Sequence, residues 1–262
     1  MKNNVITGFL MFFLVYGTVF FGQTINGLTE DNRKALESII VEKYYTSTKQ
    51  DAKDTIGGFL EAGSVVYRIY VNLKPGYHLQ AVYAVPKHEF FLKTTTKFYN
   101  NKEGGAKSAD LINDKHINDN NVALDSWLTI GVATEKRFGV LKSEDKDGSI
   151  LKRKGLDKND GLYLAGQTQK LLLFGLDLSF FDNEKDASYF HSNNGSWATI
   201  GGGKAQGEMK EGNKVLIGQL TTTGKLSFEF NLQVGAPNGA TIQFVAKNPE
   251  GSEVEFKQLT YK

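Results

Sequence analysis

The chain has 262 residues, with 31 lysines and arginines against 29 aspartates and glutamates, four histidines and no cysteine. Its formal net charge of +2 is close to neutral, which excludes the strongly basic surface that proteins use to bind nucleic acid or anionic membranes. The lack of cysteine excludes disulfide bonds and cysteine nucleophiles, so the fold must be held by its core or by bound ions.

The first 22 residues predict a cleavable export signal. A single cation, Lys2, precedes an apolar run over residues 5–21, which is the pattern of a signal peptide. A run of about 17 residues is at the lower limit for crossing a bilayer, so an uncleaved membrane anchor is the alternative. We expect the mature chain to start near Gln23, to contain no membrane span and to be secreted or held at the cell surface.

Residues 23–63 predict a short helix, a strand and a loop. Thr29 followed by two acidic residues is typical of a helix start. The segment 36–45 has some apolar residues at helical spacing, but its β-branched and aromatic residues favour a strand. Residues 46–63 are small and polar and indicate a loop.

From Ser64 onward the hydrophobic pattern has a period of two. The runs 65–71 and 79–84 alternate, and Lys74-Pro75-Gly76 between them has the residue order of a type II turn, so we predict a hairpin. Further strands are expected at 90–99, 122–132, 161–164, 169–178, 215–220, 226–234 and 242–244.

These patterns predict an all-β chain of the β-sandwich or jelly-roll type with a short N-terminal helix, and a closed barrel is the alternative. The stretches 126–131 and 196–201 share a Ser-Trp-x-Thr-Ile-Gly pattern. This internal similarity is consistent with a module over 64–262 that consists of two packed β halves, 64–141 and 161–262. Chance similarity is the alternative.

A series of short motifs resembles a module of exported bacterial proteins that occurs at the cell surface and in gliding-type secretion. The clearest are Val-Tyr-Arg-Ile-Tyr at 66–70, Leu-Gln-Ala-Val-Tyr at 79–83, Leu-Asp-Ser-Trp-Leu-Thr-Ile-Gly at 124–131 and Val-Leu-Ile-Gly-Gln-Leu-Thr-Thr at 215–222, with weaker ones at 94–100, 195–197 and 231–233. The resemblance covers about residues 64–262. It implies an extracellular β module and no established activity or catalytic residues.

Two tryptophans with polar neighbours are candidates for glycan binding. An indole ring can stack on a sugar while nearby carboxylates or amides bind its hydroxyls. The alternative is that both indoles belong to the core; we note that strand alternation would place Asp125 on the same face as Trp127. The predicted ligand-binding residues are Asp125, Trp127, His191, Asn193, Asn194 and Trp197.

Two acidic loops, 144–148 and 157–161, are candidates for Ca²⁺. Alternating Asp and Asn on a glycine-containing loop can supply the oxygens that calcium requires, although neither loop has the full spacing of an EF-hand. An ordinary solvated turn is the alternative. The predicted metal ligands are Asp145, Asp147, Asp157, Asn159 and Asp160.

No catalytic constellation is evident in the sequence. There is no Gly-x-Ser-x-Gly nucleophile motif and no His-Glu-x-x-His zinc motif. The sequence therefore favours a secreted or surface-associated binding module without catalytic activity, for a glycan or an extracellular matrix component. Two alternatives stay open: a glycoside hydrolase that uses paired carboxylates, and a structural subunit that pairs through edge strands.

Overall fold

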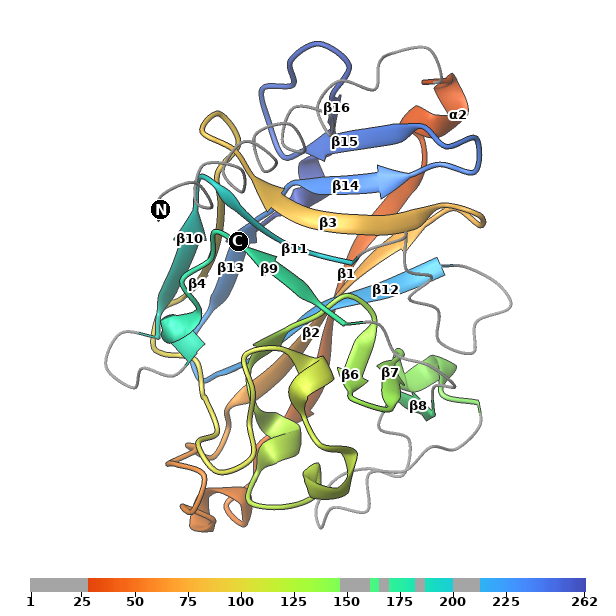
Figure 1. Cartoon of the computed structure of the whole chain (residues 1–262). Helices are drawn as coiled ribbons and strands as arrows, with labels where there is room; N and C mark the ends of the chain where they lie inside the picture. Colours follow the sequence, from red (N-terminus) through yellow and green to blue (C-terminus); the bar gives the residue numbers. More distant parts are fainter. Residues whose placement is uncertain (1–27, 147–160, 165–169, 182–186, 200–212) are drawn as a thin grey trace, which may run out of the picture.

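The computed structural model describes residues 28–146, 161–164, 170–181, 187–199 and 213–262 and shows an all-β, sandwich-like fold (Figure 1). The predicted export signal at 1–22 lies outside these residues. The α-helix of the described part, α2 (Glu30–Arg33), starts where the sequence predicts, because the Thr29 side chain accepts a hydrogen bond from the Asn32 amide at 3.2 Å. One-turn 3₁₀ helices cover Asp51–Lys53, Ala109–Leu111, Asp114–His116, Val122–Leu124, Lys142–Glu144, Leu178–Phe181 and Lys257–Leu259.

The first layer of the sandwich is a four-stranded sheet in the order β1-β2-β12-β5. Its strands are β1 (Leu36–Thr46), β2 (Val65–Leu73), β12 (Asn213–Thr222) and β5 (Trp127–Leu128). β2 and β12 pair over their whole lengths although about 140 residues separate them in the sequence. The two halves considered from the sequence, 64–141 and 161–262, therefore both contribute to this sheet.

The second layer consists of two sheets that join end to end. The larger has the order β16 (Val254–Glu255), β15 (Thr241–Val245), β14 (Leu232–Gly235), β3 (His78–Ala84), β11 (Gly195–Ala198) and β9 (Leu172–Phe174). The smaller has the order β10 (Tyr189–Ser192), β4 (Phe90–Thr94), β13 (Leu226–Glu229) and β17 (Thr260–Tyr261).

The strand pairing shows how these two sheets connect. β3 pairs with β11 and β14, and β4 pairs with β10 and β13. Only two residues separate β10 from β11 and β13 from β14, so each pair is one long strand with a break in its middle. Figure 1 shows the bend at this break, where β4, β10 and β13 turn steeply away from β3 and β14. A separate three-stranded sheet contains β6 (Val132–Thr134), β7 (Arg137–Gly139) and β8 (Leu162–Leu164).

The main core fills the space between the two layers. It includes Ile69 and Val71 from β2, Ile217 from β12, and Val82 and Phe228 from the bent second layer. A second cluster covers the other face of β2 and contains Tyr44, Val66, Tyr70, Leu124 and Trp127. Because both faces of β2 are covered, its sequence is almost continuously apolar rather than alternating.

The conspicuous arginine of the Tyr-Arg motif belongs to this second cluster. Arg68 is only 2% exposed, and its guanidinium lies 3.6 Å from the centre of the Tyr44 ring. Its Nε donates to Gln219 Oε1 at 2.9 Å and its Nη1 donates to the Gly161 carbonyl at 3.1 Å. The role of Arg68 in this structure is therefore to link β2, β12 and β8 within the core.

The predicted hairpin over 65–84 is wrong, although the predicted turn is present. The Tyr77 amide donates to the Lys74 carbonyl and Gly76 has a φ of +86°, as a type II turn requires. However, β2 belongs to the first layer and β3 to the second. The turn therefore carries the chain from one layer to the other. The two strands do not pair in one sheet; instead, their apolar faces pack against each other between the layers.

The continuous strand predicted over 122–132 is also wrong. Asn121 has a left-handed backbone with a φ of +63°, and residues 122–124 form a 3₁₀ turn before the two-residue strand β5. Trp127 lies in this short strand at the edge of the first layer, whereas Trp197 lies in β11 inside the second layer. The shared Ser-Trp pattern therefore does not occupy equivalent positions.

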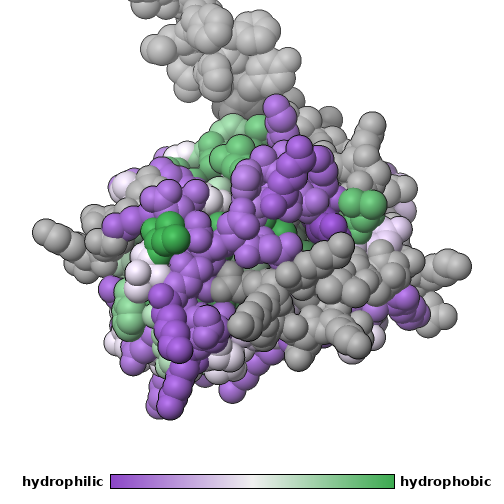
Figure 2. Space-filling view, turned by 90° about the horizontal axis from the view of Figure 1, so that it is seen from below, coloured by the Kyte–Doolittle hydropathy of each residue, from purple (hydrophilic) through white to green (hydrophobic). Residues whose placement is uncertain are grey.

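The part of the surface that Figure 2 shows is mainly hydrophilic where the residues are described. On the face seen in Figure 2, hydrophobic side chains form small separate groups between hydrophilic ones. Within the described part of the chain, no helix has the length and apolar character needed to cross a membrane. The large hydrophobic side chains that are exposed include Phe59 at 63%, Phe174 at 53% and Tyr189 at 48%.

Candidate functional site

Both tryptophans that the sequence offered as sugar-stacking residues lie in the core. Trp197 is 0% exposed, packs edge-on against Phe90 and Phe230 with ring centres 5.2 and 5.8 Å away, and donates from Nε1 to the Ile217 carbonyl at 3.2 Å. Trp127 is 2% exposed in the second cluster. Neither indole presents a face to a ligand, so the prediction that they stack on sugars is wrong and the core alternative holds.

Asp125 is buried as well, and it organises the backbone beside it. Its Oδ1 accepts from the Asn101 amide at 2.7 Å and its Oδ2 accepts from the Ala106 amide at 2.9 Å. Burial raises the pKa of Asp125 to about 8, although hydrogen bonds from the amides of Asn101, Ala106 and Ser126 oppose this rise. The carboxyl therefore holds the loop over residues 101–106 and does not bind a ligand.

The other three predicted ligand-binding residues lie at the surface. His191, Asn193 and Asn194 are exposed at the end of β10 and in the break between β10 and β11. The structure thus separates the six predicted residues into a buried set of three and an exposed set of three. Of the exposed set, Asn194 borders a pocket.

This pocket, which we call the outer pocket, has a volume of about 360 Å³. The residues that give it its chemistry are Tyr83, Phe174, Asn194, Ser196, Gln233 and Gln243. They come from five neighbouring strands of the second layer, β15, β14, β3, β11 and β9, and from Asn194 just before β11.

Strand alternation explains why these side chains point away from the core. In β11, Trp197 is buried inside the sandwich, so its neighbour Ser196 lies on the outer side. In β14 and β15, Gln233 and Gln243 alternate in the same way with core residues and are directly paired in register. The outer pocket therefore lies on the solvent side of the bent second layer.

The lining of the outer pocket is uncharged. Its polar groups are the amides of Asn194, Gln233 and Gln243 and the hydroxyl of Ser196, and Phe174 adds an exposed aromatic ring. Gln233 Nε2 donates to Gln80 Oε1 at 2.9 Å, which fixes one amide at the rim. Such a surface can donate and accept several hydrogen bonds and contact an apolar face, without an ion to neutralise.

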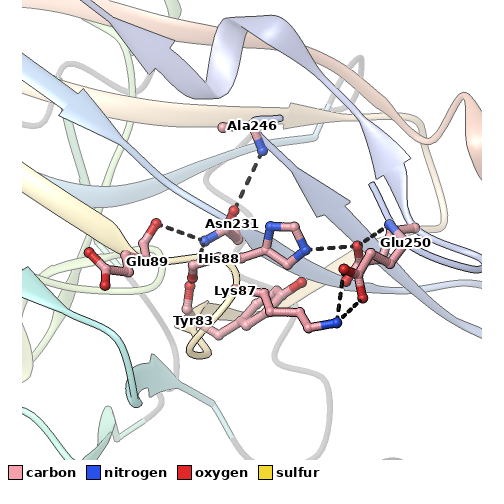
Figure 3. A network of polar contacts seen from close by, with 8 residues as sticks. Tyr83, Lys87, His88, Glu89, Asn231, Ala246 and Glu250 are labelled. Atoms are coloured by element: carbon pink, nitrogen blue, oxygen red, sulfur yellow. Dashed lines mark hydrogen bonds and ion pairs between the residues drawn. The ribbon is translucent and has the colours of Figure 1, made fainter. Parts of the chain in front are cut away.

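A network of buried polar contacts fixes the Tyr83 end of this pocket (Figure 3). Asn231, in the break between β13 and β14, lies with Nδ2 within hydrogen-bond distance of the carbonyls of Tyr83, His88 and Glu89, at 3.2, 2.9 and 3.3 Å. It therefore closes the turn over residues 85–89, which joins β3 to β4, two strands that run in the same direction. Burial raises the pKa of the Tyr83 hydroxyl, and the nearby Glu253 carboxylate adds to this effect.

The same network ties this turn to the loop before β16. His88 Nε2 lies 2.9 Å from Glu253 Oε2, which also accepts from the Glu250 amide at 2.7 Å, and Lys87 Nζ lies 2.6 Å from Glu250 Oε2 (Figure 3). The wall of the outer pocket at Tyr83 is thus held from two sides before a ligand arrives. Preorganised polar groups reduce the entropy that binding costs.

A second pocket of about 370 Å³ lies elsewhere, between the loop at Gly58 and Phe59 and the segment 97–102. Its lining contains Lys97 and Lys102 and, like that of the outer pocket, no Asp, Glu or His. A glycosidase of the usual type needs two carboxyl groups facing one cleft. Neither of these two pockets offers such a pair.

The predicted calcium loops fall largely outside the described residues. Asp147, Asp157, Asn159 and Asp160 are not among them, and Asp145 is described as a buried residue, 8% exposed. Its neighbour Glu144 pairs with Lys214. In the ranges that the structure describes, no three His, Asp or Glu side chains form a metal-binding group. The calcium site stays a prediction.

Most of the outer pocket could not be found from the sequence. Only Asn194 was among the predicted residues; Tyr83, Phe174, Gln233 and Gln243 are brought together by strand pairing across more than 150 residues. The one local signal is that a glutamine alternates with buried apolar residues in both β14 and β15. This alternation predicts an outer face of the sheet, but it does not predict a pocket there.

Comparison with known proteins gives no relative: no protein-family model matches the chain, and no curated protein or solved structure matches it significantly. The likeness to modules of exported bacterial proteins therefore stays an expectation that rests on the sequence motifs.

Proposed function

We propose that this chain is an exported, non-catalytic binding module whose outer pocket takes a neutral saccharide. The observation that carries the proposal is the uncharged lining of the pocket, in which three amides and a hydroxyl line the same space as an exposed phenylalanine. Saccharide hydroxyls both donate and accept hydrogen bonds, as do amide side chains, and the C–H faces of sugar rings pack on aromatic rings.

The lack of charge also argues against other ligand classes. An ionised ligand that loses water on binding needs a partner of opposite charge, because an unpaired buried charge is costly. The outer pocket has none in its lining. A purely apolar ligand would cover the amide of Gln243 and the hydroxyl of Ser196 without offering them hydrogen bonds, which is also unfavourable.

Two further features support the remaining parts of the proposal. The charged start and apolar run of residues 1–22 have the pattern of an export signal, which would deliver the protein to extracellular glycans. The two described pockets lack acidic and histidine side chains, so neither has the carboxyl pair of a usual glycosidase or a histidine base. Rigid β-sheet scaffolds with recognition residues on one face are well suited to binding alone.

Phe174→Ala is expected to weaken saccharide binding at least about tenfold, because it removes the aromatic face of the outer pocket. The measurement is retention on a panel of neutral polysaccharides, followed by calorimetric titration with the one that is retained. The matched control is Phe59→Ala, which removes an equally exposed phenylalanine from the second pocket. Equal affinity of the Phe174→Ala variant and the native protein, or retention on none of the polysaccharides, would reject the proposal.

A further inference from the structure

A pair of exposed aromatic side chains lies on β10, outside the outer pocket. Tyr189 is 48% exposed, and its ring centre lies 4.9 Å from that of His191 with the two planes 20° apart. Phe91 on the neighbouring strand β4 lies next to them, with its ring centre 6.2 Å from that of Tyr189. Exposed aromatic residues that gather in this way are unusual on a mainly polar surface and mark interaction sites.

These aromatic residues share the outer side of the sheet with the outer pocket. In the long strand formed by β10 and β11, Phe190 and Trp197 are buried in the same core. Their neighbours Tyr189, His191 and Ser196 therefore lie on the opposite, solvent-facing side.

The two features are also close along this strand. His191 precedes Asn194, which lines the outer pocket, by three residues, so their Cα atoms are at most about 11 Å apart. Asn193, which the sequence also flagged, is exposed between them. The outer pocket and the aromatic pair are therefore neighbours along the chain, on either side of the bend between β10 and β11.

Charged side chains beside the aromatic pair include Glu229 and Lys93. The carboxylate of Glu229, in the same cross-strand row as Phe91 and His191, is 2.8 Å from the Lys247 ammonium group. Lys93 lies opposite Tyr189, where a long flexible side chain can donate hydrogen bonds to hydroxyl groups. Tyr189 and His191 combine an apolar ring with a polar edge, as saccharide-contacting residues do.

From this arrangement we infer that the ligand is a linear polysaccharide chain, which fills the outer pocket with one part and continues along β11 and β10 to Tyr189 and His191. The inference rests on the proposed function and adds to it the length and direction of the ligand. A short saccharide can fill only one of the two places, whereas a chain contacts both, and the second contact is then made at a high effective concentration.

The test compares short and long saccharides on the same protein. The probes are neutral glucose, xylose, mannose and N-acetylglucosamine oligomers, each as the disaccharide and the hexasaccharide, titrated by calorimetry. We expect the hexasaccharide of the series that binds to have at least about tenfold higher affinity than its disaccharide. The double variant Tyr189→Ala/His191→Ala is expected to lose this gain and to bind the disaccharide as the native protein does.

The Phe174→Ala substitution, by contrast, is expected to weaken the binding of both the disaccharide and the hexasaccharide. The Phe59→Ala substitution is expected to weaken the binding of neither. Because Tyr189 and His191 are exposed, the double variant should unfold at nearly the native temperature, which shows that its fold is intact. Equal affinity for the two lengths in the native protein, or an undiminished gain in the double variant, would overturn this inference and leave the proposed function standing. If no oligomer of any series binds, both are overturned.

Discussion

Replacing Trp197 with alanine is expected to lower the free energy of unfolding by about 3–5 kcal/mol. The indole is fully buried in the main core, in contact with Phe90 and Phe230, and its Nε1 donates a hydrogen bond to the Ile217 carbonyl of the opposite layer. Truncation therefore removes both apolar burial and a hydrogen bond between β11 and β12. Urea unfolding followed by circular dichroism measures the loss.

The matched comparison is Phe174→Ala, which removes an aromatic ring that is 53% exposed. Its unfolding free energy should stay within about 0.5–1 kcal/mol of the native value, whereas its saccharide affinity is expected to fall at least about tenfold. The two substitutions thus separate a core aromatic from a surface one. A loss of less than about 1 kcal/mol in the Trp197→Ala protein would show that the indole is not packed between the layers.

Replacing Asp125 with asparagine is expected to change how stability depends on pH. In the folded chain the carboxyl group of Asp125 keeps its proton up to about pH 8, whereas an aspartate in the unfolded chain releases its proton at about pH 4. Between these values the folded state binds more protons, so this carboxyl makes the native protein lose stability as pH rises, by about 1.4 kcal/mol per pH unit. The Asp125→Asn protein lacks this contribution.

The asparagine variant has a cost of its own, because its Nδ2 cannot accept the amide of Ala106. It should be less stable than the native protein by about 1–3 kcal/mol near pH 4. At about 1.4 kcal/mol per pH unit this difference should fall to zero within about one to three pH units and then reverse in sign, so that the variant is the more stable protein near pH 8. Urea unfolding at a series of pH values measures it. The control is Glu103→Gln, an exposed acid, for which we expect a difference near zero at every pH. A constant difference between the Asp125→Asn and native proteins would contradict the raised pKa.

The fold class follows from local patterns, but the pairing of strands does not. The helix start at Thr29 is present, and so is the alternation over 226–234 except at the break over 230–231, where Asn231 is buried. Hydrogen-bonding caps and period-two burial depend on neighbouring residues. The turn at 74–76 is present as well. Which sheet the next strand enters depends on packing between distant segments, and for that reason the hairpin prediction failed.

The candidate site illustrates the same limit. Because a carboxylate is rarely buried without a partner, the position of Asp125 near Trp127 suggested that this face of the strand is exposed to solvent. The partners exist, but they are backbone amides of the loop 101–106, which a sequence pattern does not show. Conversely, Phe174 and Gln243 have no distinctive local context, and they become a candidate site only because β9 and β15 belong to one sheet.

The most direct test of the binding account is to map, by nuclear magnetic resonance, the backbone amides that shift when the retained saccharide is added. Binding at the outer pocket predicts that the largest shifts occur at Phe174, Asn194, Ser196 and Gln233. Shifts confined to the second pocket, around Phe98 to Lys102, would place the ligand elsewhere and contradict the account.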